Sequence, residues 1–458
     1  MGLSGSLAEL GLELGRLKTG TPPRLSARSI DFSVCEAQPG DDEVPYFSYW
    51  KDDLFHVEHS GVPPTDLQNS DGSYPPGSIL DRINGQLECH ITYTTSETAR
   101  IINENIHKSP MYSGVIEGVG PRYCPSIEDK IVRFPEKKEQ QIFLEPEGIG
   151  TDEYYVNGFS TCLPYDVQIE MVRTIIGCEK AEILRPAYAV EYDFVHPTQL
   201  TAFLETKVCG NLFLAGQING TSGYEEAGAQ GLIAGVNAAL RVKGLDPFVL
   251  GRDEAYIGVL IDDLVTKGTI EPYRMFTSRA EYRLLLRQDN ADLRLSRRGH
   301  EVGLLPERNF RSFEKKERAI DSEIERLKRT RLDGVTMAKL LKRPEIAYKD
   351  LPSQNPEITT EVAYQAAISI KFEGYIDRQL ADVERFRSME DKQIPAWLDY
   401  DALPNLKPEA RQKLKNILPA TLGQASRISG VTPADISIVM VWMKRGQDDC
   451  SEKVLDGE

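Results

Sequence analysis

The spacing of hydrophobic and polar residues divides the chain into a mixed first part and a helical second part. Up to about residue 245, short apolar runs typical of strands alternate with stretches of helical periodicity. Strands are predicted at 46–50, 89–94 and 188–194, and helices begin after 95 and after 163. From about residue 253 onward the apolar spacing is helical. The pattern therefore predicts α/β architecture followed by an all-α region.

The most distinctive stretch covers residues 212–240. It predicts a short apolar strand at 212–215, a glycine-rich loop, and a helix that runs through residue 240. The N-terminus of such a helix offers unpaired N–H groups and a partial positive charge, which suit a pyrophosphate or the pyrimidine edge of a flavin. An ordinary βα unit, whose glycines serve only packing, explains the pattern equally well.

Four sequence blocks decide between these alternatives. They read GRLKTGTPPR at 15–24, GVGPRYCPSIEDK at 118–130, GQINGTSGYEEA at 216–227 and EPYRMFTSRAEYR at 271–283. In this order they resemble the signatures of the MnmG/GidA family, the tRNA uridine 5-carboxymethylaminomethyl modification enzymes, which include a mitochondrial form. The resemblance runs from about residue 11 to about residue 438.

The resemblance implies a partial FAD-binding, doubly wound (Rossmann-like) domain with an inserted α+β domain and a C-terminal helical domain. We expect a remnant of the FAD domain at 1–25, the inserted domain at 26–150, the C-terminal part of the FAD domain at 151–245, a helical tRNA-binding region at 246–350, a helical partner-docking domain at 360–446 and a disordered tail at 447–458. Family members begin with a glycine-rich dinucleotide loop, whereas this sequence contains no G-x-G-x-x-G spacing. We therefore expect the first third of the enzyme to be missing from this chain.

Cys124 is the predicted catalytic residue. It lies in a Gly/Pro turn beside Arg122 and near Lys130, and cationic neighbours lower the pKa of a thiol and increase its thiolate fraction. The alternative is an inert, buried cysteine. By resemblance, the matching cysteine of the family is one of two implicated in catalysis, and the other lies in the N-terminal part. The resemblance leaves open whether Cys124 acts as nucleophile or as acid and base.

The resemblance also implies FAD, NADH and methylenetetrahydrofolate, the last as one-carbon donor. Gln217 would contact the flavin from a loop that contains Gly216, Gly220 and Gly223. The segment around Cys124 would bind the nicotinamide cofactor through Gly120, Pro121, Arg122, Tyr123, Pro125, Ser126, Ile127, Glu128, Asp129, Lys130 and Phe134.

Five arginines are predicted RNA contacts. In a helix predicted over 278–287, Arg279, Arg283 and Arg287 are spaced four apart and share one face, and Arg274 and Arg294 lie nearby in sequence. Such a stripe suits a row of phosphates. The alternative is a solvated face whose arginines pair with neighbouring carboxylates.

Composition narrows the function classes. A formal charge of −16 over 458 residues argues against a protein that coats nucleic acid indiscriminately, but it permits a local basic face. Seven scattered cysteines without a C-x-x-C pair imply neither a disulfide framework nor a zinc site, and we expect no metal. Without a long apolar run or a signal peptide, we expect a cytoplasmic bacterial protein, or a mitochondrial matrix protein, that needs no membrane.

The predicted function is FAD-dependent installation of a carboxymethylaminomethyl-type group, aminomethyl or taurinomethyl, on C5 of the tRNA wobble uridine. The implied partners are tRNA and an MnmE-type GTPase, with a homodimer of this chain inside a heterotetramer. The alternative is a catalytically incomplete fragment that only dimerises and docks tRNA or the GTPase. A folate- and flavin-dependent RNA methyltransferase is disfavoured, because such enzymes lack the long helical C-terminus seen here.

Overall fold

The computed structural model describes residues 2–41, 49–50, 80, 85–113, 116, 118–120, 125–390, 392–395 and 397–455, with the backbone alone at 386–390 and 445–455. Most of the predicted strand at 46–50 lies outside these residues. Two compact units are present. We call Gly15–Phe194 with Ile270–Pro272 the sheet unit, and Met1–Leu14, Val195–Thr269 and Tyr273–Glu458 the helical unit.

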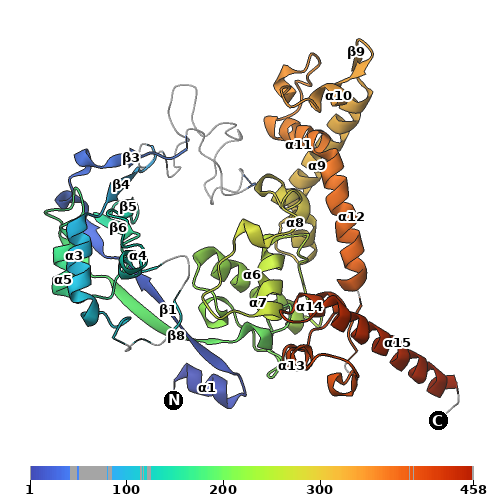
Figure 1. The fold of residues 1–458 in the computed structure, drawn as a ribbon. Helices are drawn as coiled ribbons and strands as arrows, with labels where there is room; N and C mark the ends of the chain where they lie inside the picture. Colours follow the sequence, from blue (N-terminus) through green and yellow to red (C-terminus); the bar gives the residue numbers. More distant parts are fainter. Residues whose placement is uncertain are drawn as a thin grey trace. The chain divides into compact units, whose positions relative to one another are not determined.

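A six-stranded antiparallel sheet forms the sheet unit (Figure 1). Its strand order is β3 (Glu36–Gln38), β4 (Cys89–Tyr93), β5 (Gln141–Pro146), β6 (Glu153–Asn157), β2 (Arg24–Ser26) and β7 (Ile183–Arg185). Alternate residues such as Ile142, Leu144 and Val156 point inward and are fully buried. They share one core with the apolar sides of α3 (Ser96–Asn105), α4 (Ile127–Arg133) and α5 (Tyr165–Val172). The strand predicted at 89–94 and the helices predicted after 95 and 163 are confirmed.

Two longer strands, β1 (Leu14–Thr21) and β8 (Tyr188–Val195), pair in a separate sheet. The boundaries between the two units fall at the start of β1 and at the end of β8. The domain boundary predicted at residue 150 is wrong, because β5 and β6 on either side of it are hydrogen-bonded neighbours. Gly148 and Gly150 form the turn between them, and a glycine-rich turn resembles a linker in sequence.

One core of the helical unit joins α6 (Tyr224–Val242), α7 (Tyr256–Lys267) and the short α1 (Leu3–Glu9). The predicted helix through residue 240 is confirmed by α6. The predicted strand at 212–215 is wrong, since Phe213 makes only an isolated bridge with Glu205. A strand needs a ladder of partners, and the described residues supply a single pair at this place.

The rest of the helical unit has two further cores. The first joins α9 (Glu307–Arg329), α10 (Met337–Leu341) and α11 (Thr360–Lys371), and β9 (Arg331–Leu332) with β10 (Val335–Thr336) forms a hairpin between α9 and α10. The second joins α13 (Pro408–Ile417), α14 (Leu422–Arg427) and α15 (Pro433–Leu455). The helices α8 (Ala291–Glu301) and α12 (Glu373–Glu390) complete the unit. Mixed α/β architecture with C-terminal helices is therefore confirmed.

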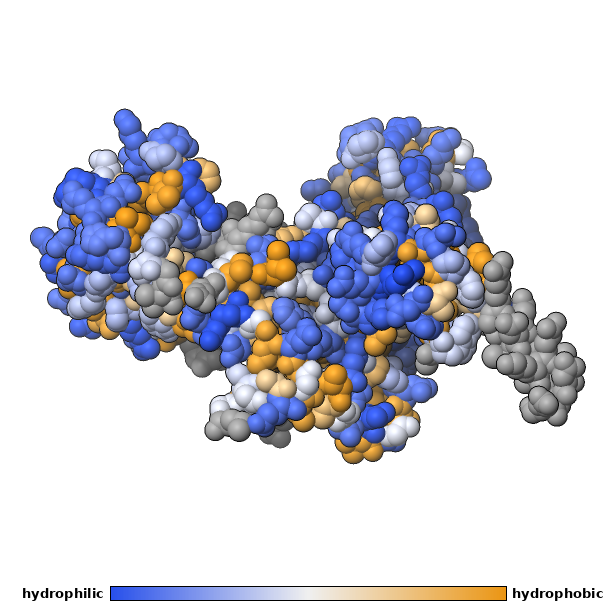
Figure 2. Space-filling model, turned by 60° about the horizontal axis from the view of Figure 1, so that its bottom comes forward, coloured by the Kyte–Doolittle hydropathy of each residue, from blue (hydrophilic) through white to orange (hydrophobic). Residues whose placement is uncertain are grey.

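The polar tail predicted at 447–458 differs from the structure, because α15 continues to Leu455. Its Gln, Glu and Lys residues are compatible with a helix. The face drawn in Figure 2 is mostly hydrophilic, with hydrophobic side chains in scattered groups. Nowhere in the described chain is a helix both long and apolar enough to cross a membrane. Those residues also contain no group of three or more His, Cys, Asp or Glu suited to a metal ion.

Candidate functional site

A pocket of about 590 Å³ in the sheet unit is lined by the first two sequence blocks. Lys18, Thr19 and Gly20 come from the first block. Gly118, Val119, Gly120, Pro125, Ser126 and Asp129 come from the second. The blocks are directly joined, because the backbone N–H of Lys18 donates to the carbonyl of Val119 at 2.9 Å. A β-carbon on Gly118 would lie 2.9 Å from the backbone of Leu17, so this close approach requires glycine.

The predicted catalytic residue Cys124 lies outside the described residues, as do Pro121, Arg122 and Tyr123. Their sequence neighbours Gly120 and Pro125 both line the pocket. The described chain therefore lines the pocket immediately before and immediately after residues 121–124.

The pocket lining combines cations, hydroxyls and the carboxylates of Asp129 and Glu271. Lys18 and Arg133 supply positive charge, and hydroxyls come from Ser126, Ser160 and Thr161. Asp129 accepts a hydrogen bond from the Tyr112 hydroxyl at 2.9 Å. Burial and this carboxylate raise the pKa of Tyr112, so the phenol keeps its proton. Such a lining suits a ligand that carries both anionic groups and hydroxyls.

Other predicted cofactor contacts have structural roles. Ile127 and Glu128 were predicted to contact the nicotinamide cofactor, but both side chains are fully buried in the protein. Glu128 accepts hydrogen bonds from the Thr161 hydroxyl at 2.7 Å and from the backbone N–H of Cys162 at 3.3 Å. The Lys130 ammonium donates to the carbonyl of Gly158 at 2.8 Å, and Phe134 is exposed. These residues fix α4, which in turn positions Ser126 and Asp129.

Glu128 predicts a specific pH dependence of stability. Burial raises its pKa above the ordinary value of 4.5, although hydrogen bonds from Thr161 and Cys162 oppose this. The folded state therefore holds the proton more firmly, and stability is lost as pH rises above 4.5 through the folded pKa. We expect the melting temperature of Glu128→Gln, relative to that of the wild type, to increase between about pH 4 and pH 8. A difference that does not change with pH would contradict this assignment.

The third block folds as a rigid loop in the helical unit. Gly216 and Gly220 adopt positive φ values of +79° and +78°, which favour glycine. The buried Gln230 of α6 holds the loop, since its Oε1 accepts from the Gly216 N–H at 2.8 Å and its Nε2 donates to the Thr221 hydroxyl at 2.8 Å. Sequence reasoning missed Gln230, although the amides Gln230 and Asn237 among small and apolar residues on a buried helix face are a usable signal. Gln217 itself is exposed.

The fourth block clamps this loop at the start of α6. Tyr273 donates its N–H to the Gly220 carbonyl at 2.9 Å, and Arg274 donates to Glu226 at 3.0 Å. Gly223 is the N-cap of α6 and provides no side-chain cap. A β-carbon on Gly223 would lie 1.9 Å from Glu226 Oε2. The third and fourth blocks therefore form one structure.

Two observations indicate that the loop at 216–223 and the N-terminal end of α6 are suited to a flavin. The N–H groups at the start of α6 lack a side-chain cap, so they suit an electron-rich group. The buried atoms Asn219 Oδ1 and Glu226 Oε2 have no hydrogen-bond partner among the described residues. Buried acceptors of this kind are normally satisfied, which is consistent with a donor supplied by a ligand.

Family models match most of the chain. The model described as "Glucose inhibited division protein A" matches residues 1–246. Those for the "tRNA modifying enzyme MnmG/GidA C-terminal helical domain" and for its "C-terminal helical bundle" match 307–380 and 382–456. A relative from Caldicellulosiruptor saccharolyticus, named "tRNA uridine 5-carboxymethylaminomethyl modification enzyme MnmG", is 50% identical over 97% of this chain. This chain covers 70% of that relative.

The chain belongs to the MnmG/GidA family. A relative of the same name from Protochlamydia amoebophila is 52% identical over 99% of the chain, which covers 71% of that protein. The structure of Aquifex aeolicus GidA in its form I crystal superposes with a TM-score of 0.83 at 48% identity. That match covers 96% of this chain and 70% of the Aquifex chain.

The arginine stripe predicted for this family member does not form. Residues 278–287 are not helical beyond the short turn Thr277–Arg279. Arginines spaced four residues apart therefore do not lie on one helix face here. Arg274 pairs with Glu226, Arg279 lies 3.7 Å from Asp263 and over the Tyr273 ring, Arg287 pairs with Asp289, and Arg294 donates to the carbonyl of Arg287. Among the five, only Arg283 is exposed without an ion pair to the described residues. Arginines that pair with carboxylates of the same chain can have the same sequence spacing as arginines that face solvent.

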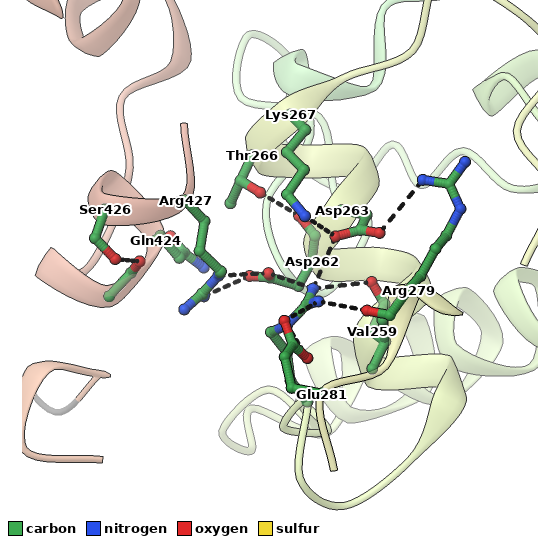
Figure 3. A network of polar contacts seen from close by, with 12 residues as sticks. Val259, Asp262, Asp263, Thr266, Lys267, Arg279, Glu281, Gln424, Ser426 and Arg427 are labelled. Atoms are coloured by element: carbon green, nitrogen blue, oxygen red, sulfur yellow. Dashed lines mark hydrogen bonds and ion pairs between the residues drawn. The ribbon is translucent and has the colours of Figure 1, made fainter. Parts of the chain in front are cut away.

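Arg252 instead anchors a largely buried network of charges, of which Asp262, Asp263 and Glu281 are labelled in Figure 3. Its side chain is 9% exposed and donates to Asp262 at 3.0 Å, Asp263 at 2.8 Å and Glu281 at 2.7 Å. Arg427 of α14 holds Asp262 of α7 through two hydrogen bonds of 2.6 and 2.7 Å. Burial alone would raise the pKa of Asp263, but the Lys267 hydrogen bond and the Arg252 charge outweigh it and lower that pKa. In this MnmG/GidA-family chain the network ties α14 to α7.

Proposed function

We propose that this protein acts in the modification of the tRNA wobble uridine and installs a carboxymethylaminomethyl-type group at C5. The main support is the match to relatives of that name at 50–52% identity across nearly the whole chain. The site geometry agrees with it, because the four family blocks are the parts that line the pocket and build the glycine loop.

The proposal includes FAD, NADH and methylenetetrahydrofolate. The loop from Gly216 to Gly223 and the start of α6 would hold the flavin, with Gln217 exposed beside it. Bound flavin would supply electron transfer between the nicotinamide and the one-carbon unit. Lys18 and Arg133 in the sheet-unit pocket would bind the phosphates of the nicotinamide cofactor, and Asp129 would accept hydrogen bonds from its hydroxyls.

Cys124 would act on the uracil ring. Addition of its thiolate to the ring forms a C–S bond and places negative charge on the carbon to be modified, and elimination later breaks the same bond. The alternative role is proton transfer to or from the ring. We place the reaction in the bacterial cytoplasm or mitochondrial matrix, in a homodimer that works with an MnmE-type GTPase.

A second function is favoured by one feature of the sequence. It has no G-x-G-x-x-G loop, and the chain spans about 70% of the length of the relatives that it matches. We propose as this second function a docking module that binds tRNA or the GTPase without carrying out the modification. The two functions differ in whether the chain by itself holds flavin.

Replacing Cys124 by alanine is expected to reduce formation of the modified nucleoside by at least about 100-fold. The measurement is mass spectrometry of tRNA nucleosides from bacteria that lack their own family member and express this chain. Cys209→Ala is the matched control, because Cys209 lies in the helical unit and its thiol makes only a long contact with the Gly210 carbonyl. Equal modification by the wild type and Cys124→Ala would remove Cys124 from the mechanism.

The visible spectrum of the purified chain separates the two functions. After incubation with excess FAD and desalting, retained flavin near one per chain would support the enzyme. A folded chain without flavin would support the docking module, and no modified nucleoside would then be expected in the complementation experiment.

A further inference from the structure

One short segment has a charge opposite to that of the whole chain. Residues 326–343 contain seven Lys or Arg and one Asp, a formal charge of +6, whereas the chain carries −16. The segment consists of the end of α9, the β9–β10 hairpin and α10 (Figure 1). Six of its basic residues are exposed, and we call four of them, Arg331, Lys339, Lys342 and Arg343, the basic tip.

The basic tip stands on a packed base. Leu327, Met337 and Leu341 of the same segment are fully buried in the core shared by α9, α10 and α11. Leu332 pairs with Val335 across the hairpin turn, in which Asp333 and Gly334 both have positive φ. Leu327, Met337 and Leu341 therefore face inward, and the basic residues of the tip face solvent on a defined backbone, as does Leu332 of the hairpin.

Nearby carboxylates neutralise only part of this charge. Glu323 pairs with Arg326, Glu325 pairs with Arg329, and Glu373 is shared by Lys328 and Lys342. Arg331 donates to the carbonyl of Gly334 at 3.1 Å, which leaves its charge uncompensated. Lys339 and Arg343 have no carboxylate within ion-pair distance among the described residues. Lys371 of α11 adds a further cation, since its ammonium donates to the carbonyls of Arg343 and Pro344.

We propose that the basic tip binds the phosphate backbone of RNA. This inference rests on the proposed function, which requires a tRNA surface. It moves that surface away from residues 274–294, where Arg274, Arg279 and Arg287 each lie within ion-pair distance of a carboxylate. A chain of net charge −16 repels a polyanion overall, so binding needs a place where positive charge is concentrated. Exposed Lys and Arg on a rigid hairpin and helix supply it, because phosphate contacts are sequence-independent and gain affinity by counterion release.

The test compares two triple charge reversals of equal size. Arg331→Glu/Lys339→Glu/Arg343→Glu removes the basic tip. Arg311→Glu/Arg318→Glu/Lys413→Glu is the control, since Arg311 and Arg318 are exposed, Lys413 is half-buried, and each already pairs with a carboxylate four positions away. The probe is a fluorescent transcript of a tRNA that carries a wobble uridine, titrated over a range of salt concentrations.

We expect the tip variant to bind the transcript at least about tenfold more weakly at low salt, with a salt slope reduced by about 2 to 3. The control should bind within about threefold of the wild type. Circular dichroism checks folding, and if the reversal unfolds the chain, Lys339→Gln/Arg343→Gln is expected to give a smaller loss in the same direction.

The outcomes separate this inference from the proposed function. If the wild type binds the transcript tightly and the tip variants bind it equally well, the role of the basic tip is overturned and the proposed function is not. A wild-type chain that does not bind the transcript overturns both. Binding to anionic phosphatidylserine vesicles in place of the transcript would assign the tip to a membrane surface and likewise overturn the inference.

Discussion

Replacing Gly258 by alanine is expected to lower the free energy of unfolding by about 3 kcal/mol, the upper end for one added methyl group in a packed interior. Gly258 is buried in the first turn of α7. Its β-carbon would lie 2.2 Å from the carbonyl oxygen of Gly251 and 2.6 Å from that of Leu250. These are backbone atoms, so a side-chain rotation cannot relieve the clash. Either α7 or the preceding loop must move.

The matched control is Gly235→Ala in α6. Gly235 is exposed, and no atom lies within 4 Å of its β-carbon position. Alanine in a helix interior is favoured over glycine by roughly 0.5–1 kcal/mol, so this variant should be more stable than the wild type. Urea unfolding followed by circular dichroism measures both changes. Similar shifts for the two variants would contradict the packing seen around α7.

The second large effect is expected at Arg427, whose loss should loosen the C-terminal bundle. The core of that bundle lies within residues 398–443 and shares no hydrophobic cluster with α7 in the described part of the chain. The Asp262–Arg427 pair is therefore a main contact between them, with side chains 12% and 19% exposed. Breaking one partner of a mostly buried pair costs about 2–3 kcal/mol, somewhat below the cost for a fully buried pair.

Hydrogen exchange of α14 and α15 measures this loosening, since the protection of both helices should fall in Arg427→Ala. The double variant Asp262→Asn/Arg427→Ala should lose less than the sum of the single losses, with a coupling of roughly 1–2 kcal/mol. Lys413→Ala is the control, because the Lys413–Glu409 pair, with side chains 36% and 66% exposed, is expected to contribute less than about 0.5 kcal/mol. Strictly additive losses would mean that Arg427 acts through other contacts.

Acid is expected to weaken the same network. The lowered pKa of Asp263 means that its contribution to stability is complete above its ordinary value of 3.8 and is lost as the pH falls through the lower folded value. Arg252 would then lose one of its three carboxylates, and the contact between α7 and α14 would weaken with it.

Much of this protein could be predicted from local sequence. The spacing of apolar residues predicted the helix α6, the helical second half and the two strands β4 and β8, because helix and strand periods are properties of adjacent residues. The four blocks identified the family for a related reason. Glycines such as Gly118 and Gly216 are required by the backbone itself, so they appear in the sequence wherever that backbone is used.

The roles of charged residues depended on tertiary structure. Arg274, Arg279 and Arg287 have the spacing of an exposed helical stripe, yet the chain around them is not helical and their partners Glu226, Asp263 and Asp289 are set by packing. The domain boundary near residue 150 was likewise decided by the pairing of β5 with β6. An ion pair or a strand ladder joins residues that can be any distance apart in the sequence, so no periodic pattern reveals the pairing. The sequence by itself therefore determined the elements and the family, and only the fold decided which charges face solvent.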